Sequence, residues 1–102
     1  MLIENDTLIV KSWPENWNVE NSGKKANTIR QVSDYEWETF DLITHNGMLY
    51  TGSTIITKIK VINTDTSQEF ERTLTNATHW YIAGIRTLIL SWNSAEGNET
   101  ET

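Results

Sequence analysis

The sequence predicts a small α+β domain, made mainly of β-strands with one or two short helices, whose sheet is curved or closed into a small barrel. Three observations lead to this fold class. A chain of 102 residues can form one hydrophobic core and is too short for two. Segments of alternating apolar and polar residues recur along the chain, as in half-buried strands. Helix signals are confined to two short segments, and such a mixture suggests one curved sheet.

The first predicted strand and helix cover residues 7–13 and 14–22. Residues 7–13 (TLIVKSW) are apolar and β-branched, which is typical of a strand. Pro14 suits the first position of a helix, because its missing N–H has no partner there in any case. Gly23 stands where a helix commonly ends on a left-handed residue, so the helix is expected to stop before it.

A second strand is predicted over residues 26–32 (ANTIRQV), whose side chains alternate between two sides. Ser33 and Glu36 then have the spacing of a capping box, which predicts a helix over residues 34–43. The apolar stripe of that helix is untidy, and a strand over residues 36–42 stays open as the alternative.

The second half of the chain predicts a hairpin and a last strand. Residues 45–47 (HNG) indicate a turn. Residues 54–62 (TIITKIKVI) and 68–74 (QEFERTL) both alternate and are joined by a polar turn, as in a β-hairpin. Residues 87–92 (TLILSW) read as the final strand of a single domain over residues 1–94.

Composition limits the classes of function. The chain has no cysteine, which excludes disulfides and a thiol nucleophile and favours a reducing, cytoplasmic location. No apolar run is long enough to span a membrane, so no membrane partner is expected. The net charge of −6 argues against a broad nucleic-acid-coating surface, although it leaves room for a local basic pocket. Residues 95–102 are acidic and lack large apolar side chains, which predicts a disordered tail.

The candidate site is the short basic loop at residues 23–30 (GKKANTIR), where a helix ends and a strand begins. It holds the cations Lys24, Lys25 and Arg30 and the hydroxyl of Thr28. Such a loop can hold an anion or a polarised carbonyl by charge-assisted hydrogen bonds. The alternative is a solvated basic turn. No metal-ligand pattern or cofactor motif stands out, and neither a metal nor a cofactor is expected.

The pattern Gly23-x-Lys25-x-x-Thr28-Ile29-Arg30 resembles the signature of the ASCH superfamily, a group of small β-barrels similar to the PUA domain. Residues 13–17 (WPENW) resemble the corresponding segment of small phage-type members. The resemblance implies a cleft beside the motif that binds RNA or a nucleotide.

The same resemblance implies residue roles, because some members hydrolyse the amide of N4-acetylcytidine. Lys25 would be the base or electrostatic activator, Thr28 the nucleophile, and Arg30 a phosphate or structural partner. A glutamate downstream of the motif would complete the site, and Glu69 and Glu71 are the candidates for it.

Five tryptophans are many for a chain of this size. Most are expected in the core, where large aromatic side chains dominate burial. Trp17 or Trp80 could instead form a stacking wall for a base.

Three functions therefore stay open. The first is a module that binds RNA or a nucleoside through Gly23, Lys24, Lys25, Thr28 and Arg30. The second is an amidohydrolase that acts on an acylated nucleoside. The third is a phage interaction protein that binds a host protein, for which the acidic surface would suit mimicry of nucleic acid. The oligomeric state is left open.

Overall fold

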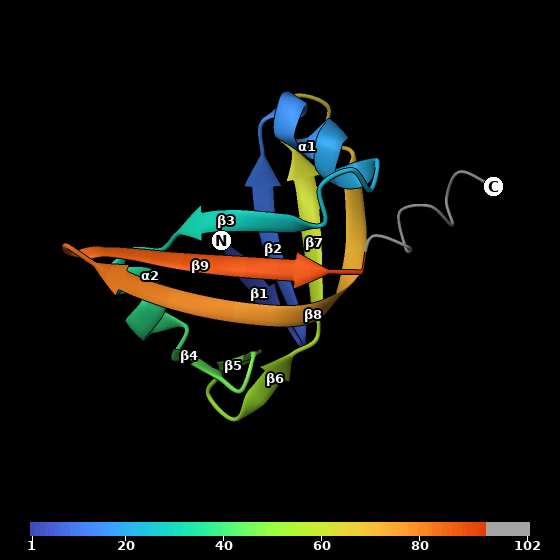
Figure 1. Cartoon of the computed structure of the whole chain (residues 1–102). Helices are drawn as coiled ribbons and strands as arrows, with labels where there is room; N and C mark the ends of the chain where they lie inside the picture. Colours follow the sequence, from blue (N-terminus) through green and yellow to red (C-terminus); the bar gives the residue numbers. More distant parts are fainter. Residues whose placement is uncertain (94–102) are drawn as a thin grey trace.

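A computed structural model describes residues 1–93, which form two sheets and two short helices (Figure 1). This arrangement confirms the predicted α+β class. The helices are α1 (Pro14–Asn21) and α2 (Asp34–Thr39). The strands are β1 (Leu2–Glu4), β2 (Thr7–Ser12), β3 (Asn27–Gln31), β4 (Leu42–His45), β5 (Met48–Thr51), β6 (Thr54–Ile56), β7 (Lys58–Asn63), β8 (Glu69–Ile82) and β9 (Ile85–Trp92). Residues 95–102, expected to be disordered, lie outside the described part of the chain.

The larger sheet has six strands in the order β1-β2-β7-β8-β9-β3, and the smaller has the order β4-β5-β6. The β2–β7 pair is parallel, whereas the other pairs are antiparallel. Within residues 1–93 neither sheet closes into a barrel. The curved sheet is therefore the form that the chain adopts, and β1 and β3 are its two edges.

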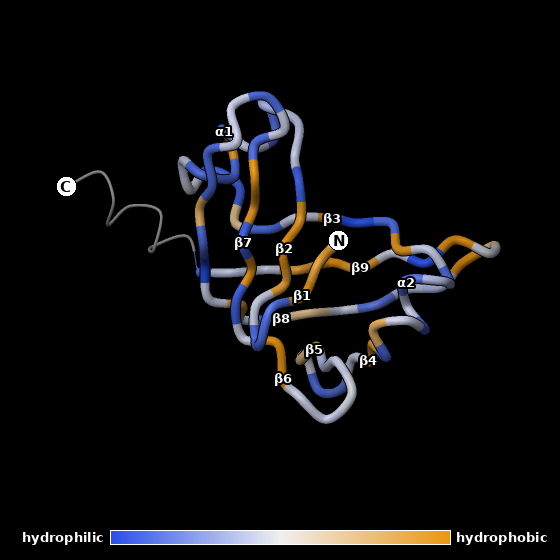
Figure 2. Tube along the Cα trace, turned by 180° about the vertical axis from the view of Figure 1, so that it is seen from behind, coloured by the Kyte–Doolittle hydropathy of each residue, from blue (hydrophilic) through white to orange (hydrophobic). Residues whose placement is uncertain are grey.

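Strand β8 gives the larger sheet its curvature. It pairs with β7 along its first half and with β9 along its second half, and the register shifts between Leu74 and Asn76. A bulge of this kind bends a strand. Figure 1 shows the result, in which β9 and β3 lie across β2 and β7. Both halves of the sheet consequently face one core, and Figure 2 shows apolar segments along β2 and β7.

Helix α1 is fixed to the sheet at several points. Pro14 occupies its first turn, as predicted, and Gly23 follows it with a φ of 84°. The indole of Trp17 donates to the carbonyl of Val61 at 2.9 Å. Arg72 is buried and donates to the carbonyl of Asn21 at 3.1 Å. This last contact places a cation at the negative end of the helix, where it is stabilising.

Helix α2 begins at the predicted capping box and ends earlier than predicted. The Ser33 hydroxyl accepts a hydrogen bond from the Glu36 amide at 3.0 Å. The helix stops at Thr39, and Asp41 then takes a left-handed φ of 50°. Leu42 is buried and begins β4. The predicted extension to residue 43 was wrong, and so was the alternative strand over residues 36–42, because core packing of Leu42 requires the chain to turn there.

One side of α2 packs on the far end of β8 and β9. The Trp37 ring stacks on the ring of His79, with centroids 4.1 Å apart. Arg86 lies over the Trp37 ring and forms a 3.0 Å ion pair with Asp34. Burial and the Arg86 guanidinium hold the pKa of His79 below its ordinary value. A neutral His79 ring can accept the 3.1 Å hydrogen bond from Arg86.

The strand predictions need three corrections. Residues 54–62 form β6 and β7 rather than one strand, because the Thr57 amide and hydroxyl turn aside to bond Asp6, at 2.9 and 2.7 Å. Strand β8 continues past its predicted end at residue 74 to Ile82, and its residues 76–82 form a hairpin with β9. Strands β1, β4 and β5 were not predicted.

Neither helix within residues 1–93 has the length and apolar content to cross a membrane.

The predicted turn at residues 45–47 is confirmed and joins the two sheets. Asn46 and Gly47 have φ values of 51° and 77°, as a two-residue hairpin turn requires. The carbonyl of Gly47 accepts a 2.8 Å hydrogen bond from the Ala77 amide in β8. A Cβ on Gly47 would lie only 2.6 Å from the Asn76 side-chain oxygen.

We predict that Gly47→Ala lowers the free energy of unfolding by about 1 to 2 kcal/mol, from left-handed strain together with displacement of the exposed Asn76 side chain. Gly84→Ala is the matched control, because Gly84 has the same φ region, at 78°, with nothing within 4 Å of its added Cβ. It should cost about 1 kcal/mol, from strain alone. Urea unfolding of both variants measures the difference. Equal losses would show that the junction of the sheets tolerates the added methyl group.

Candidate functional site

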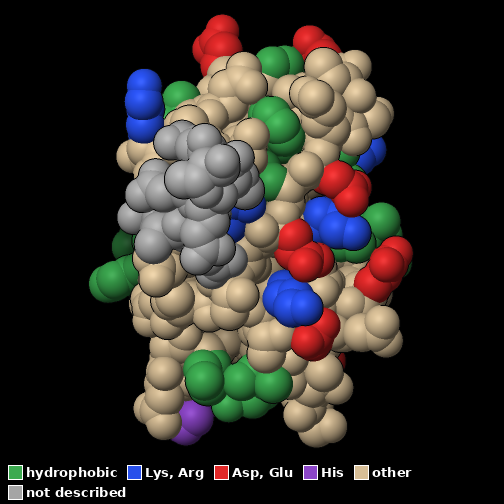
Figure 3. All heavy atoms as spheres, turned by 90° about the vertical axis from the view of Figure 1, so that its right-hand side faces the viewer, with side chains coloured by type: hydrophobic (Ala, Val, Ile, Leu, Met, Phe, Trp, Pro, Cys, Tyr) green, Lys and Arg blue, Asp and Glu red, His purple; other side chains and the backbone are tan. Residues whose placement is uncertain are grey.

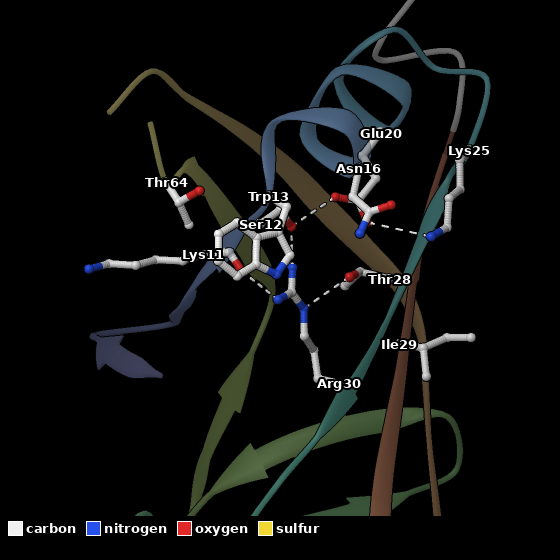
Figure 4. Close-up of a pocket in the computed structure, with 10 residues that line it drawn as sticks. All are labelled: Lys11, Ser12, Trp13, Asn16, Glu20, Lys25, Thr28, Ile29, Arg30 and Thr64. Carbon is white, nitrogen blue, oxygen red and sulfur yellow. Dashed lines mark hydrogen bonds and ion pairs between the residues drawn. The ribbon is translucent and has the colours of Figure 1, made fainter. Parts of the chain in front are cut away.

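The centre of the candidate site is Arg30, which joins the edge strand β3 to β2. Its Nε donates to the hydroxyl of Thr28 at 3.0 Å. Its two terminal nitrogens donate to the carbonyl of Lys11 and to the hydroxyl of Ser12. All three nitrogens of the guanidinium are thus engaged (Figure 4). Because β2 and β3 are not neighbours in the sheet, this one side chain connects strands that the sheet leaves unpaired.

Two features of the surroundings of Arg30 act on its pKa in opposite directions. Burial lowers the pKa of Arg30 from its ordinary value, and the Glu20 carboxylate acts in the opposite direction. An arginine nevertheless stays protonated in a protein. The charge is therefore held in a partly dry place, where a hydrogen bond to an anionic or polarised ligand is stronger than in water.

Glu20 brings a buried carboxylate to the same place. Its side chain is 1% exposed, and it lies one helical turn beyond Trp17 on the inward side of α1. One carboxylate oxygen accepts a 3.2 Å hydrogen bond from the Ser12 hydroxyl. The other lies 3.9 Å from the ammonium of Lys25. Glu20 therefore contacts Lys25 directly and reaches Arg30 through the Ser12 hydroxyl.

The turn after α1 directs Lys25 toward this carboxylate. Gly23 adopts a left-handed φ of 84°, a conformation that costs glycine little. The Lys25 amide can then donate to the carbonyl of Val19 at 3.4 Å, which folds the loop back over the helix. Figure 4 shows the Lys25 side chain reaching inward, whereas Ile29 points away. Lys24 is exposed and does not line the cavity.

These side chains line a cavity of about 290 Å³. Its lining residues are Lys11, Ser12, Trp13, Asn16, Glu20, Lys25, Thr28, Ile29, Arg30 and Thr64. Thr28 is 3% exposed, whereas the ring of Trp13 is 69% exposed. The cavity thus combines buried hydroxyls, a carboxylate and the cations Lys25 and Arg30 with an exposed aromatic ring. Figure 4 shows the side chain of the third lining cation, Lys11, pointing away from these groups. A second cavity of about 450 Å³ shares Lys11 and Arg30 with the first. Its apolar lining residues are Met1, Leu2, Ile9, Val10 and Ile62.

The other predicted site residues lie elsewhere. Glu69 and Glu71 are exposed on β8, and Glu69 forms a 3.5 Å ion pair with Lys60 of β7. Figure 3 shows acidic and basic side chains gathered on this side of the molecule. Trp17 is buried and packs against Phe70 with ring centroids 5.6 Å apart. The structure therefore puts these three residues outside the cavity lining.

Trp80 is exposed, but it lies near the far end of β8 and lines a different hollow, beside the turn of β4 and β5. The aromatic ring at the cavity is Trp13, and the carboxylate is Glu20. Sequence reasoning missed both as site residues. A signal for Glu20 was available, since it follows Trp17 by three residues and so shares a face of the helix with a large apolar side chain.

No protein-family model, curated protein or solved structure matches the chain. Membership of the ASCH superfamily therefore stays a prediction that rests on the motif at residues 23–30. Within residues 1–93, no group of three or more histidine or acidic side chains is placed to hold a metal ion.

We predict that Arg30→Ala lowers the free energy of unfolding by about 2 kcal/mol, because it leaves the Lys11 carbonyl and two hydroxyls without their donor. Arg30→Lys should recover part of this loss, since it keeps the charge without the planar fork. Lys11→Ala is the control, because Arg30 contacts only the main chain of Lys11 and the side chain is exposed. Thermal unfolding compares the three variants. A loss for Lys11→Ala as large as that for Arg30→Ala would contradict the bridging role.

Proposed function

We propose that the cavity between β2, α1 and β3 binds a nucleoside or a single nucleotide unit of RNA. The observation that carries the proposal is the convergence of Lys25, Arg30 and the Thr28 hydroxyl on one cavity with the exposed Trp13 ring at its rim. A cavity of about 290 Å³ lies at the lower end of ligand pockets, which suits one nucleoside better than a longer segment.

The base and the phosphate of a nucleotide each have a matching group in this proposal. Trp13 offers an aromatic face on which a base can stack. Glu20 is a buried acceptor and suits a base with an exocyclic amino group, as carboxylates do toward cytosine. Lys25 and Arg30 supply donors for a phosphate or a polarised carbonyl. Because Lys25 and Arg30 are the cations directed toward the cavity, binding should release about two counterions and depend only moderately on salt.

We predict that cytidine monophosphate binds the protein and that Lys25→Ala weakens binding about tenfold, through loss of a charge-assisted hydrogen bond. Lys24→Ala is the matched control, because Lys24 adjoins Lys25 in the chain and lies outside the cavity lining. Trp13→Ala should also weaken binding about tenfold by removing a stacking face, whereas Trp80→Ala should not. Isothermal titration calorimetry measures all five proteins. Equal effects of the two lysines would contradict this site.

A second candidate function is hydrolysis of an N4-acylated cytidine. The observation that favours it is that Thr28, Lys25 and a carboxylate, Glu20, line the same cavity. In this proposal the Thr28 oxygen bonds the amide carbonyl carbon, and the Lys25–Glu20 pair takes its proton and delivers it to the leaving nitrogen. Water then hydrolyses the acyl-threonine ester to release the carboxylic acid. The Arg30 hydrogen bond to Thr28 stabilises negative charge on the attacking oxygen.

For this second function we predict that the protein releases cytidine from N4-acetylcytidine, and chromatography measures the cytidine formed. Thr28→Ala should abolish turnover, and Thr28→Ser should keep a measurable part of it, because serine retains the hydroxyl. Thr54→Ala, at an exposed threonine of β6, is the control. Absence of turnover by the unmodified protein would remove the hydrolase and leave the binding proposal standing.

A further inference from the structure

The outer face of β3, β9 and the second half of β8 carries no charged side chain. In the paired register, rows of outward residues run across the three strands. The rows are Asn27–Ser91–Asn76, Ile29–Ile89–Thr78, Gln31–Thr87–Trp80 and Ile85–Ile82. These strands lie in front of β2 and β7 in Figure 1. A neutral face of this extent is unusual in a chain with a net charge of −6.

Several apolar side chains of this neutral face are open to solvent. Ile29 is 60% exposed, Trp80 56%, Ile82 65% and Ile85 49%. The opposite face of the same strands is buried, with Leu88 and Leu90 fully covered. Contiguous exposed apolar side chains of this kind mark an interaction surface.

The other half of the same sheet behaves differently. On β7 and the first half of β8, the outward side chains include the exposed Lys58, Glu69 and Glu71 and the half-buried Lys60. Charges at such positions prevent a sheet face from packing on another sheet without desolvation cost. The loss of charge begins where β8 passes its bulge and pairs with β9 instead of β7. Charge therefore separates the neutral face from the rest of the surface.

We infer that the neutral face binds the same face of a second copy of this chain. Nucleic acid is a poor occupant, because the face offers no cation for phosphate. A protein that binds through ion pairs is also a poor occupant, because the neutral face has no charged side chain to pair with it. Two copies of a neutral face, in contrast, pack as aligned or crossed sheets without burying a charge. A two-fold axis that lies in the plane of the interface, parallel to the strands, would pair each row with the same row of the second copy.

The size of the face fits a weak but specific dimer. Three strands about 4.8 Å apart, with about 3.3 Å per residue along β9, make a face of roughly 14 by 23 Å. Two such faces have a flat area of about 640 Å² in total. The relief of their protruding side chains brings the buried accessible surface toward about 1,000 Å², the lower limit for a specific interface. Thr28 and Arg30 point to the other side of β3, so such an interface leaves most of the candidate cavity open. Ile29 is the one residue that belongs to both the neutral face and the cavity lining.

Sedimentation equilibrium of the full chain over a range of concentration tests the dimer. We expect a monomer–dimer equilibrium that is populated by about 100 µM. Raising the ionic strength from about 0.01 M to about 0.15 M should strengthen it, because shortening the Debye length from about 30 Å to about 8 Å screens the mutual repulsion of two acidic chains.

Substitutions locate the interface. Ile29→Lys and Ile82→Lys should each raise the dimer dissociation constant about tenfold or more, because each places a charge in the apolar contact. Both side chains are exposed, so the fold should persist, and circular dichroism checks it. Ile43→Lys is the matched control, since Ile43 is 55% exposed on β4, outside the neutral face.

Three results would overturn the inference. A protein that stays monomeric at about 100 µM has no such self-association. An equal loss of dimer in Ile43→Lys would show that another surface, or general apolar exposure, is responsible. A monomer that captures a different protein through Ile29 and Ile82 would show that the face has another occupant.

Discussion

The hydrogen bonds of Arg30 hold together the part of the protein that forms the candidate site. The larger sheet curves but does not close within residues 1–93, and β2 and β3 meet without pairing. A guanidinium can bridge such a gap because its donors form a rigid fork. The same gap also provides room for the two cavities that share Arg30.

The candidate site depends on this arrangement more than on the basic loop alone. Lys24 and Lys25 adjoin in sequence, yet only Lys25 lines the cavity. The left-handed conformation of Gly23 and the hydrogen bond from the Lys25 amide to the Val19 carbonyl fold the loop so that Lys25, and not Lys24, faces the cavity. Glu20 and Ser12 then fix the cation and complete a connected polar group with Arg30. An acidic chain can in this way keep a small local excess of positive charge where a ligand would bind.

Local patterns in the sequence predicted those parts of the fold that local interactions determine. Pro14, Gly23 and the Ser33–Glu36 box marked helix boundaries, because each acts through its immediate neighbours. The end of α2 and the split between β6 and β7 depend on Leu42 reaching the core and Thr57 reaching Asp6, and neither contact is visible in a local pattern. For the site, the motif indicated Lys25, Thr28 and Arg30. It could not indicate Trp13 or Glu20, whose approach to the cavity depends on how α1 packs.

The proposed function requires that Arg30 lines a ligand cavity and is not only a structural bridge between strands. Two-dimensional ¹H–¹⁵N NMR of the Arg30 Nε–H and the Trp13 indole N–H, during titration with cytidine monophosphate, tests this requirement most directly. We expect both resonances to shift and to saturate along one binding curve. Saturable shifts confined to other groups, such as the indole of Trp80, or no shift of either resonance at millimolar ligand, would contradict it.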